Sequence, residues 1–275
     1  MPEAQEFEFN KKEFDYLRSV VKNETGIISD EGKYTMYYSR LSRRLRKLKL
    51  SNFVEYISYL ENNLNSEVTE LVNAVTTNLT AFFREEHHFD FLKESIIREK
   101  RKKHDKTLRI WSAACSTGEE AYSIAMSIKE ALHDYKDWDI KILATDIDSN
   151  VVAIARAGVY KDDRVGDLDH SRIKRFMKKG TGSNSGYIRM NKDVVEMVKF
   201  NKLNLLKPWP MKEKFDVIFC RNVVIYFDKE TKMKLVARFH QQLLNKGYLI
   251  MGHSESLYQV TDDFELLGKT VYQKL

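Results

Sequence analysis

The sequence is poor in cysteine, with only Cys115 and Cys220 among its 275 residues. Two cysteines supply neither a disulfide framework nor a set of metal ligands, so we expect no metal and a reducing compartment, the cytoplasm. No apolar run approaches the length that spans a membrane, and the first residues, MPEAQEFEFNKKEF, are too acidic and polar for a secretory signal. These absences argue against disulfide-rich secreted proteins and membrane-inserted proteins.

What is present is an ordinary globular composition with a positive charge. Hydrophobic residues make up 43% of the chain and charged residues 31%, which suits two domains or one large domain. The formal net charge is +6 and the sequence pI is about 9.0. This charge permits an acidic partner, whether nucleic acid, anionic membrane or acidic protein, without choosing among them.

The first part of the chain has only helical periodicity. Apolar residues recur at helical spacing in FDYLRSVV, FVEYISYLENNL and EVTELVNAV, and the connections between these segments are short. The pattern predicts a small helical bundle. We place an all-helical domain over residues 1–88 and a linker helix over 89–105.

From residue 106 the pattern changes to strands that alternate with helices. The predicted strands are LRIWSA, IKILATDI, FDVIFC, GYLIMG and a terminal KTVYQKL, and helical patterns follow the first four. Such alternation predicts an α/β domain over 106–275, with a mainly parallel sheet between helices. Residues 160–200 break the rhythm, and the runs YIRM and VEMVKF predict an inserted subdomain of antiparallel strands.

Unusual polar residues follow the first two predicted strands. The first is followed by Ser-Thr-Gly and then Glu119 and Glu120, and the second ends at Asp146. An acid at the end of a second strand can hold the hydroxyls of a ribose, although a helix cap is the alternative for Asp146. The first loop has one glycine and two acids, which repel phosphate and favour a cationic ligand. A nucleoside with an amino-acid tail and a positive sulfur, S-adenosylmethionine, fits both observations.

The strand FDVIFC is followed by Arg221, Asn222 and Tyr226, which we expect to face the same ligand. A surface ion pair is the alternative for Arg221. The loop that contains Asn204 and Leu205 is positioned to cover an adenine, or is a plain connection.

Four segments together resemble the CheR family, the chemotaxis receptor glutamate O-methyltransferases. They are VNAVTTNLTAFFREEHHF, WSAACSTGEEAYSIAM, FCRNVVIYFD and GHSES, and the similarity runs from about residue 10 to the C-terminus. The resemblance implies an all-helical N-terminal domain joined to a class I, Rossmann-like S-adenosylmethionine-dependent methyltransferase domain. The insert resembles an antiparallel β-subdomain that in some members binds a peptide at the receptor C-terminus.

The resemblance also implies roles for individual residues. Tyr226 matches a tyrosine close to the transferred methyl group, and Glu119 would be only an acid of the first helical turn. The residues that match cofactor-binding positions of the family are Asn78, Thr80, Arg84, Glu120, Asp146, Asn204, Leu205, Arg221 and Asn222.

The implied reaction moves a methyl group from S-adenosylmethionine to a receptor glutamate and releases S-adenosylhomocysteine. A glutamate with a reference pKa of about 4.3 is already ionised at neutral pH, so the reaction needs no general base. Arg84 and Tyr226 are the candidate catalytic residues that orient this carboxylate, and Arg84 has pairing with the cofactor carboxylate as its alternative. We expect His87 and His88 to be helix-surface or packing residues.

The segment YYSRLSRRLRKLKL (37–50) is a basic amphipathic helix by its spacing. Its charges are either a solvated face over the bundle or a surface for the glutamate-rich cytoplasmic domain of a receptor. The residues of this candidate substrate-binding face are Arg40, Arg43, Arg44, Arg46 and Lys47.

Two rival functions share the fold. An RNA methyltransferase would agree with the basic charge, but no motif for stacking or reading a base is present, so we expect no nucleic acid partner. A non-catalytic sensor of S-adenosylmethionine would not need the intact set that includes Arg84, Glu120, Asp146 and Tyr226. The resemblance implies a monomer.

Overall fold

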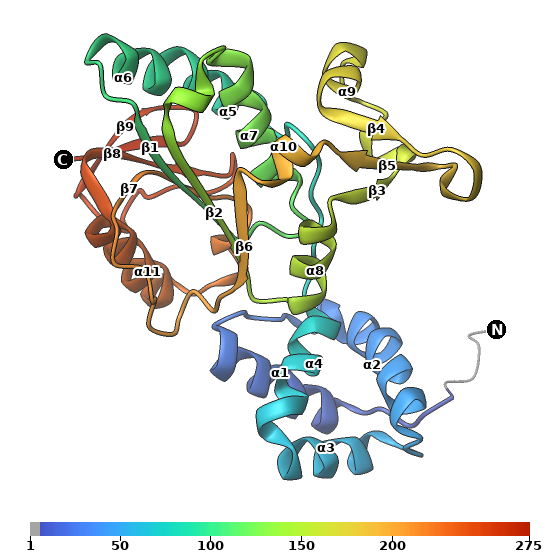
Figure 1. Ribbon diagram of the computed structural model, residues 1–275. Helices are drawn as coiled ribbons and strands as arrows, with labels where there is room; N and C mark the ends of the chain where they lie inside the picture. The colour runs from blue at the N-terminus through green and yellow to red at the C-terminus, as the bar shows by residue number, and fades with distance from the viewer. Residues whose placement is uncertain (1–5) are drawn as a thin grey trace.

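The computed structural model describes residues 6–275 and contains a helical domain beside an α/β domain (Figure 1). In the helical domain, α1 begins after Asn10, whose side chain accepts the Lys12 N–H in a capping box with Glu13, and ends at Gly26 in the left-handed conformation (φ 74°). The helices of this domain are α1 (Lys11–Thr25), α2 (Tyr34–Leu48), α3 (Phe53–Asn62) and α4 (Leu64–Val75). The predicted bundle is confirmed.

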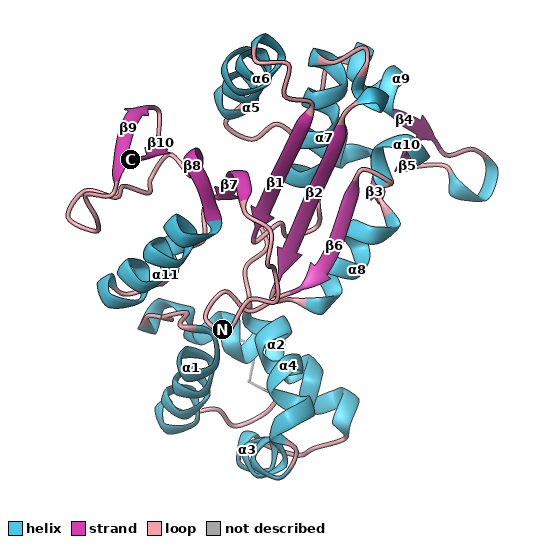
Figure 2. Cartoon of the chain, turned by 60° about the vertical axis from the view of Figure 1, so that its left-hand side comes forward, coloured by secondary structure: helices cyan, strands magenta, loops and turns pink. Residues whose placement is uncertain are grey.

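The α/β domain is built on a seven-stranded sheet in the order β6-β2-β1-β7-β8-β10-β9. Strands β6, β2, β1, β7 and β8 are parallel, whereas β10 and β9 add an antiparallel edge (Figure 2). The bounds are β1 (Thr107–Ala113), β2 (Asp139–Asp146), β6 (Val198–Lys202), β7 (Phe215–Cys220), β8 (Leu243–Met251), β9 (Phe264–Gly268) and β10 (Val271–Lys274).

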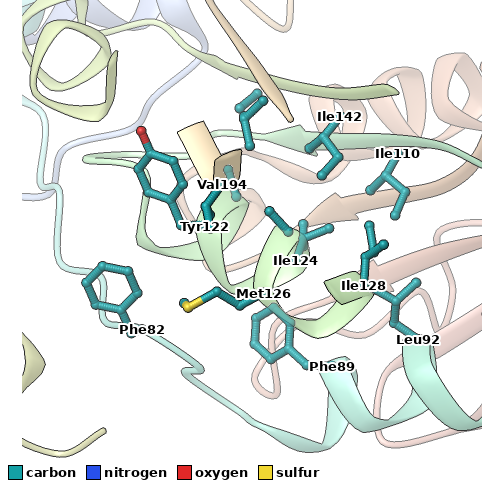
Figure 3. Close-up of a cluster of buried hydrophobic side chains, with 14 of the residues drawn as sticks. Phe82, Phe89, Leu92, Ile110, Tyr122, Ile124, Met126, Ile128, Ile142 and Val194 are labelled. Carbon is teal, nitrogen blue, oxygen red and sulfur yellow. The ribbon is translucent and has the colours of Figure 1, made fainter. Parts of the chain in front are cut away.

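Helices cover both faces of this sheet, as predicted. Alternate residues of β1 point to opposite faces: Ile110 packs with Phe89 and Ile124 in one core (Figure 3), and Trp111 packs with Phe239 in the other. The helix expected over 89–105 runs from residue 87 to 102 and belongs to the first core. The helices are α5 (His87–Phe91), a π-helical stretch (Leu92–Ile97), α6 (Arg98–Lys102), α7 (Glu119–Ala131), α8 (Ser149–Ala157) and α11 (Lys229–Gln242).

The insert is a small antiparallel sheet in the order β3-β5-β4 that projects beside the main sheet (Figure 1). Its elements are β3 (Val159–Lys161), α9 (His170–Phe176), β4 (Met177–Lys179), β5 (Tyr187–Met190) and α10 (Lys192–Val195). Short 3₁₀ turns complete the chain at Glu31–Lys33, Tyr135–Asp137, Asp162–Val165, Gly182–Asn184 and Val224–Tyr226.

Two predictions about individual elements are wrong. The run VEMVKF does not belong to the insert, because its second half forms β6, which pairs parallel with β2 at the edge of the main sheet. Alternating burial, here at Val198 and Phe200, is the same for a parallel edge strand and for an antiparallel strand. No helix follows β8: residues 252–263 form turns, and β9, which was not predicted, comes next.

The two domains meet at several hydrogen bonds. The Ile28 N–H donates to the Tyr226 carbonyl (2.8 Å), and the Asn204 side chain donates to the Glu24 carbonyl (2.8 Å). At a separate contact, between α4 and the start of α8, Asn73 Nδ2 donates to Ser149 Oγ (2.9 Å). The helical domain therefore contacts the α/β domain at loops on both sides of the strand ends. Within residues 6–275, no helix is long and apolar enough to cross a membrane.

Candidate active site

A cavity of about 1170 Å³, its mouth included, lies between the two domains at the carboxyl ends of β1, β2 and β7. This is where parallel sheets bind ligands. The helical domain contributes Thr25, Ile28 and Lys33 to its lining. Ten residues predicted to act at one ligand site all line this cavity: Asn78, Thr80, Arg84, Glu120, Asp146, Asn204, Leu205, Arg221, Asn222 and Tyr226. Their individual roles toward a ligand stay predictions.

Glu120 stands at the start of α7, after a turn at Gly118. Gly118 has φ 98°, and a Cβ there would lie 2.8 Å from the Ala155 Cβ, so the turn requires glycine. Glu120 Oε1 accepts from Ser112 Oγ (2.7 Å), and Oε2 accepts from Arg221 Nη1 (3.0 Å). Burial raises the pKa of Glu120 although the Arg221 charge opposes this. A second positive charge near Glu120 would therefore stabilise its ionised form further.

Arg221 is fully enclosed, with a side chain 2% exposed, and lies between two carboxylates. Besides Glu120, its Nη2 lies 3.4 Å from Glu85 Oε2 and donates to the Arg84 carbonyl. Burial opposes ionisation of Glu85, yet hydrogen bonds from His253 and Asn222 and the Arg221 charge lower its pKa to about 2. Sequence reasoning missed Glu85, although its place beside Arg84 in FFREEHHF was a usable signal. The surface ion pair considered for Arg221 is wrong, because both of its pairs are interior.

Asp146 ends β2 and is buried. Its Oδ2 accepts the Ser116 N–H (2.8 Å) and its Oδ1 accepts the Asp148 N–H (3.0 Å). The capping alternative for Asp146 is wrong, because it is Asp148 that caps α8 through the Asn150 N–H (2.8 Å). Burial raises the pKa of Asp146 to about 6.

The segment between the domains carries Asn78 and Arg84. Asn78 Nδ2 donates to Asp148 Oδ2 (2.9 Å), and its carbonyl accepts from Ser116 Oγ (3.1 Å), so this segment is tied to the ends of β1 and β2. Arg84 Nη1 donates to the Leu79 carbonyl (3.0 Å), and the Arg84 side chain is 32% exposed. Of the two arginines in the cavity wall, only Arg84 is open to an incoming substrate.

Glu119 is more than an acid of the first helical turn. It is fully buried, accepts from Thr117 Oγ1 (2.6 Å) and pairs with Arg164 of the insert. Arg164 also donates to the Thr80 carbonyl (3.1 Å). Because successive helical residues point about 100° apart, Glu119 and Glu120 serve different sides of the loop. Glu119 anchors the insert to the cavity wall.

His88 is a packing residue, which is one of the two roles, helix surface or packing, that we expected for it. Its ring is fully buried, and its Nε2 lies 2.8 Å from the Lys269 carbonyl. Burial, with the Arg221 charge, lowers its pKa to about 4, so the ring is neutral at pH 7. A metal ion needs several ligand atoms close together, and the side-chain nitrogen or oxygen atoms of Glu85, His87 and His88 lie within 4.8 Å of one another. Both Glu85 oxygens, however, already accept hydrogen bonds from His253.

The helix α2 lines the cavity only with Met36, near its start, and its five predicted basic residues lie outside the lining. Two of these five charges form hydrogen bonds within the helical domain. Arg40 Nη1 donates to the Ala74 carbonyl (3.3 Å) and to the Thr76 carbonyl. Arg44 Nε donates to Glu67 Oε1 (2.8 Å), and the Glu67 side chain is 2% exposed. These two arginines fasten α2 to the end of α4 and to α4 itself.

The other three charges of α2 face solvent. Arg46 forms an exposed pair with Glu6 (3.2 Å). Arg43 and Lys47 are exposed and have no ion pair within residues 6–275. Fewer charges of α2 are therefore available to a partner than the sequence suggests, and the unpaired ones among the described residues are Arg43 and Lys47.

This fold and this cavity define a two-domain S-adenosylmethionine-dependent methyltransferase. Residues 78–273 match the family model "CheR methyltransferase, SAM binding domain", and residues 12–76 match "CheR methyltransferase, all-alpha domain". The chain belongs to the CheR methyltransferase family. The resemblance drawn from the sequence motifs and the predicted cofactor, S-adenosylmethionine, are confirmed.

Named relatives agree with this family. The chain is 44% identical to chemotaxis protein methyltransferase 2 of Pseudomonas aeruginosa over 98% of this chain and 95% of that protein. It is 42% identical to the chemotaxis protein methyltransferase of Salmonella typhimurium, over 94% and 88%. Among solved structures, it is similar to S-adenosylmethionine-bound magnesium protoporphyrin IX methyltransferase of Synechocystis (TM-score 0.35, 13% identity, 68% and 76% covered).

Proposed function

We propose that this enzyme transfers the methyl group of S-adenosylmethionine to glutamate side chains of chemoreceptors, in the cytoplasm, and forms methyl esters and S-adenosylhomocysteine. One observation carries the proposal: the ten residues assigned from the family motifs line a single cavity between the two domains. The names of the relatives, chemotaxis protein methyltransferases, support the same substrate class.

The chemistry of the cavity wall fits this cofactor. Glu120 is a buried carboxylate suited to an ammonium group, and Asp146 is a buried carboxylate suited to the two hydroxyls of a ribose. Arg221 lines the cavity, and its guanidinium brings a positive charge suited to the carboxylate of the cofactor. Asn204 and Leu205 are assigned to the adenine, and Asn78, Thr80 and Asn222 to the remaining wall.

The protein's task is positioning rather than proton transfer. When bound, S-adenosylmethionine supplies a methyl group activated by its sulfonium, and the glutamate is ionised at neutral pH. Arg84, the more accessible arginine of the cavity wall, orients the incoming carboxylate, because Arg221 is enclosed between Glu85 and Glu120. Tyr226, half-buried at the cavity, offers a hydroxyl to the same group. Enclosure by both domains removes water from the carboxylate and holds it at near-attack distance.

The outer surfaces suit a receptor. Arg43 and Lys47 present charge to a glutamate-rich helix surface, and the insert offers the free edges of β3 and β4 to an extended C-terminal peptide. We propose that a monomer uses both contacts.

Reversal of the free charges on α2 should weaken receptor binding only. In Arg43→Glu/Lys47→Glu, we expect the KM for receptor to rise about 10-fold, because complementary surface charge sets encounter and register, while the Kd for S-adenosylhomocysteine stays unchanged. Steady-state methylation of receptor-containing membranes and calorimetry measure the two quantities. An equal loss of cofactor affinity would mean that this face of α2 is structural. Thr35→Glu, at an exposed position near the start of α2, is the control for added negative charge.

The raised pKa of Asp146 predicts a pH-dependent cofactor affinity. Ribose hydroxyls donate to the ionised carboxylate, so binding should lower its pKa, and affinity should rise as pH increases from about 5 to about 7.5, about tenfold for each unit of that shift. Folding has the opposite sign: burial favours the protonated acid, so its contribution to stability is full below about pH 4 and is lost as pH rises through about 6.

Calorimetry with S-adenosylhomocysteine at several pH values measures this linkage. Asp146→Asn should bind weakly with a flat profile across the same range. If Asp146→Asn keeps the wild-type slope, another buried acid, with Glu120 the first candidate, carries the titration.

The proposed reaction is tested with methyl-labelled S-adenosylmethionine and membranes that contain chemoreceptors, with bulk RNA in a parallel tube. Label on a receptor-sized band that mild alkali releases as methanol is the expected result, since a carboxyl methyl ester is alkali-labile. Alkali-stable label on RNA would overturn the substrate. Cofactor binding without transfer in either tube would favour a sensor.

A further inference from the structure

The turn that follows β8, with the sequence Gly-His-Ser-Glu (252–255), lies behind the cavity wall. None of its residues lines the cavity. It is nevertheless joined to both segments that carry the candidate catalytic residues, Arg84 on the interdomain segment and Tyr226 after β7.

Glu255 makes the first connection. It is 3% exposed, and its carboxylate accepts five backbone N–H groups from the turn after β7 and from its own turn. The donors are Val223 (2.8 Å), Val224 (2.9 Å) and Ile225 (3.3 Å) to Oε1, with Asn222 (2.8 Å) and Gly252 (2.7 Å) to Oε2. Most of these donors open the 3₁₀ turn Val224–Tyr226, so they have no partner within it. One side chain therefore determines the path of the backbone that presents Tyr226.

Gly252 makes this close approach possible. A Cβ at position 252 would lie 2.5 Å from Asn222 Nδ2 and 2.9 Å from the Asn222 backbone nitrogen. Asn222 itself has φ 58°, a left-handed conformation that a side chain larger than asparagine rarely adopts. The backbone after β7 is thus held in a conformation that depends on the turn behind it.

His253 makes the second connection. Its backbone N–H donates to Glu85 Oε2 (3.0 Å), and its Nδ1 lies 3.0 Å from Glu85 Oε1. Glu85 directly follows Arg84 and has φ 58°. Within residues 6–275, no hydrogen bond joins Arg84 to Tyr226 directly. Arg221 and Asn222 tie the Arg84–Glu85 segment to the end of β7, and the 252–255 turn connects that same segment to the backbone of the 3₁₀ turn that carries Tyr226.

We propose that the 252–255 turn is a positioning element for methyl transfer: Glu255 sets the place of Tyr226, and His253 sets the place of Arg84 through Glu85. The inference rests on the proposed function, since both positioned groups are assigned to the substrate carboxylate. Neither His253 nor Glu255 lines the cavity, and the turn acts by holding two separate segments in one geometry.

The test uses the full-length protein, labelled S-adenosylmethionine and receptor membranes. We expect Glu255→Gln to lower kcat about 10²-fold and His253→Ala about 10-fold, because small displacements of a positioning group are costly. Ser254→Ala is the matched control, since Ser254 is exposed in the same turn and its side chain makes no hydrogen bond within residues 6–275. It should keep wild-type kcat.

A double-mutant cycle separates positioning from simple stabilisation. If Glu255 acts through Tyr226, Glu255→Gln should lower kcat less than about threefold in a Tyr226→Phe background, and His253→Ala should behave likewise in Arg84→Lys. Full additivity in both cycles, with unchanged stoichiometry of S-adenosylhomocysteine binding, would overturn the inference. If Glu255→Gln fails to fold, the cycle of His253→Ala with Arg84→Lys is the test, because His253 is exposed and its replacement should be tolerated. An inactive wild type would overturn the proposed function itself, whereas an active wild type with additive variants overturns only this inference.

Discussion

Arg221→Ala is expected to weaken S-adenosylhomocysteine binding by about 10²- to 10³-fold and to lower the free energy of unfolding by about 3–5 kcal/mol. The Arg221 side chain is 2% exposed and lies 3.0 Å from Glu120 and 3.4 Å from Glu85. Its removal leaves the buried Glu120 carboxylate and the partly buried Glu85 carboxylate without their shared cation. Burial already raises the pKa of Glu120, and without Arg221 the protonated form, which cannot pair with an ammonium group, is favoured further.

Calorimetry and urea denaturation measure the two effects of Arg221→Ala. Arg221→Lys is the control that keeps the charge but not the planar fork, and it should recover stability more than affinity. In Arg221→Ala/Glu85→Gln we expect part of the lost stability to return, because one uncompensated charge is gone, while binding stays weak. Wild-type affinity in Arg221→Ala would contradict the assignment of Arg221 to the cofactor site.

Arg44→Ala is expected to lower the free energy of unfolding of the helical domain by about 3–5 kcal/mol. Arg44 donates to Glu67 Oε1 (2.8 Å) and lies 3.1 Å from Glu70, and Tyr56 donates its hydroxyl to the same Glu67 oxygen (3.0 Å). The Glu67 side chain is 2% exposed, so the variant leaves a buried carboxylate with only a phenol for a partner. Burial raises the pKa of Tyr56, so the phenol stays protonated and cannot supply the missing charge.

Denaturation followed by circular dichroism measures this loss, and Arg43→Ala is the matched control. Arg43 precedes Arg44 on the same helix but is exposed, so its removal should change stability by less than about 0.5 kcal/mol. An apolar replacement of the pair, Arg44→Met/Glu67→Leu, should recover most of the loss. Equal effects of Arg43→Ala and Arg44→Ala would show that the buried pair contributes no more than a surface charge.

The contrast between Arg43 and Arg44 illustrates what a sequence pattern does not contain. Helical spacing predicts the apolar stripe of α2 correctly, yet it assigns all the arginines to one polar surface. Arg44 lies on α2 between the apolar side and the solvent side of the helix. Its side chain is largely buried because α4 packs against α2 and supplies Glu67 as its partner. A variant of Arg44 would therefore lose substrate binding because the helical domain is destabilised, and not because a contact with the substrate is removed.

The sequence alone determined the fold class, the helical domain, most strands of the sheet and the polar residues at the strand ends. Local periodicity reports which side of an element is buried, and parallel strands bring their carboxyl ends to one edge, so Glu120, Asp146 and Arg221 were expected together. Their common cavity also agrees with the family motifs, which extend over nearly the whole chain.

Only the tertiary structure decided the pairing of β6 and the partners of the buried charges. An alternating run fits either sheet, and the choice of β2 as its neighbour depends on the crossover through α8. Glu120 meets Arg221 across 101 residues of chain, and Glu255 meets the turn after β7 across about thirty. The physical reason is range: the spacing of apolar residues is a local signal, whereas the partner of a buried charge is supplied by whichever distant element the packing brings beside it.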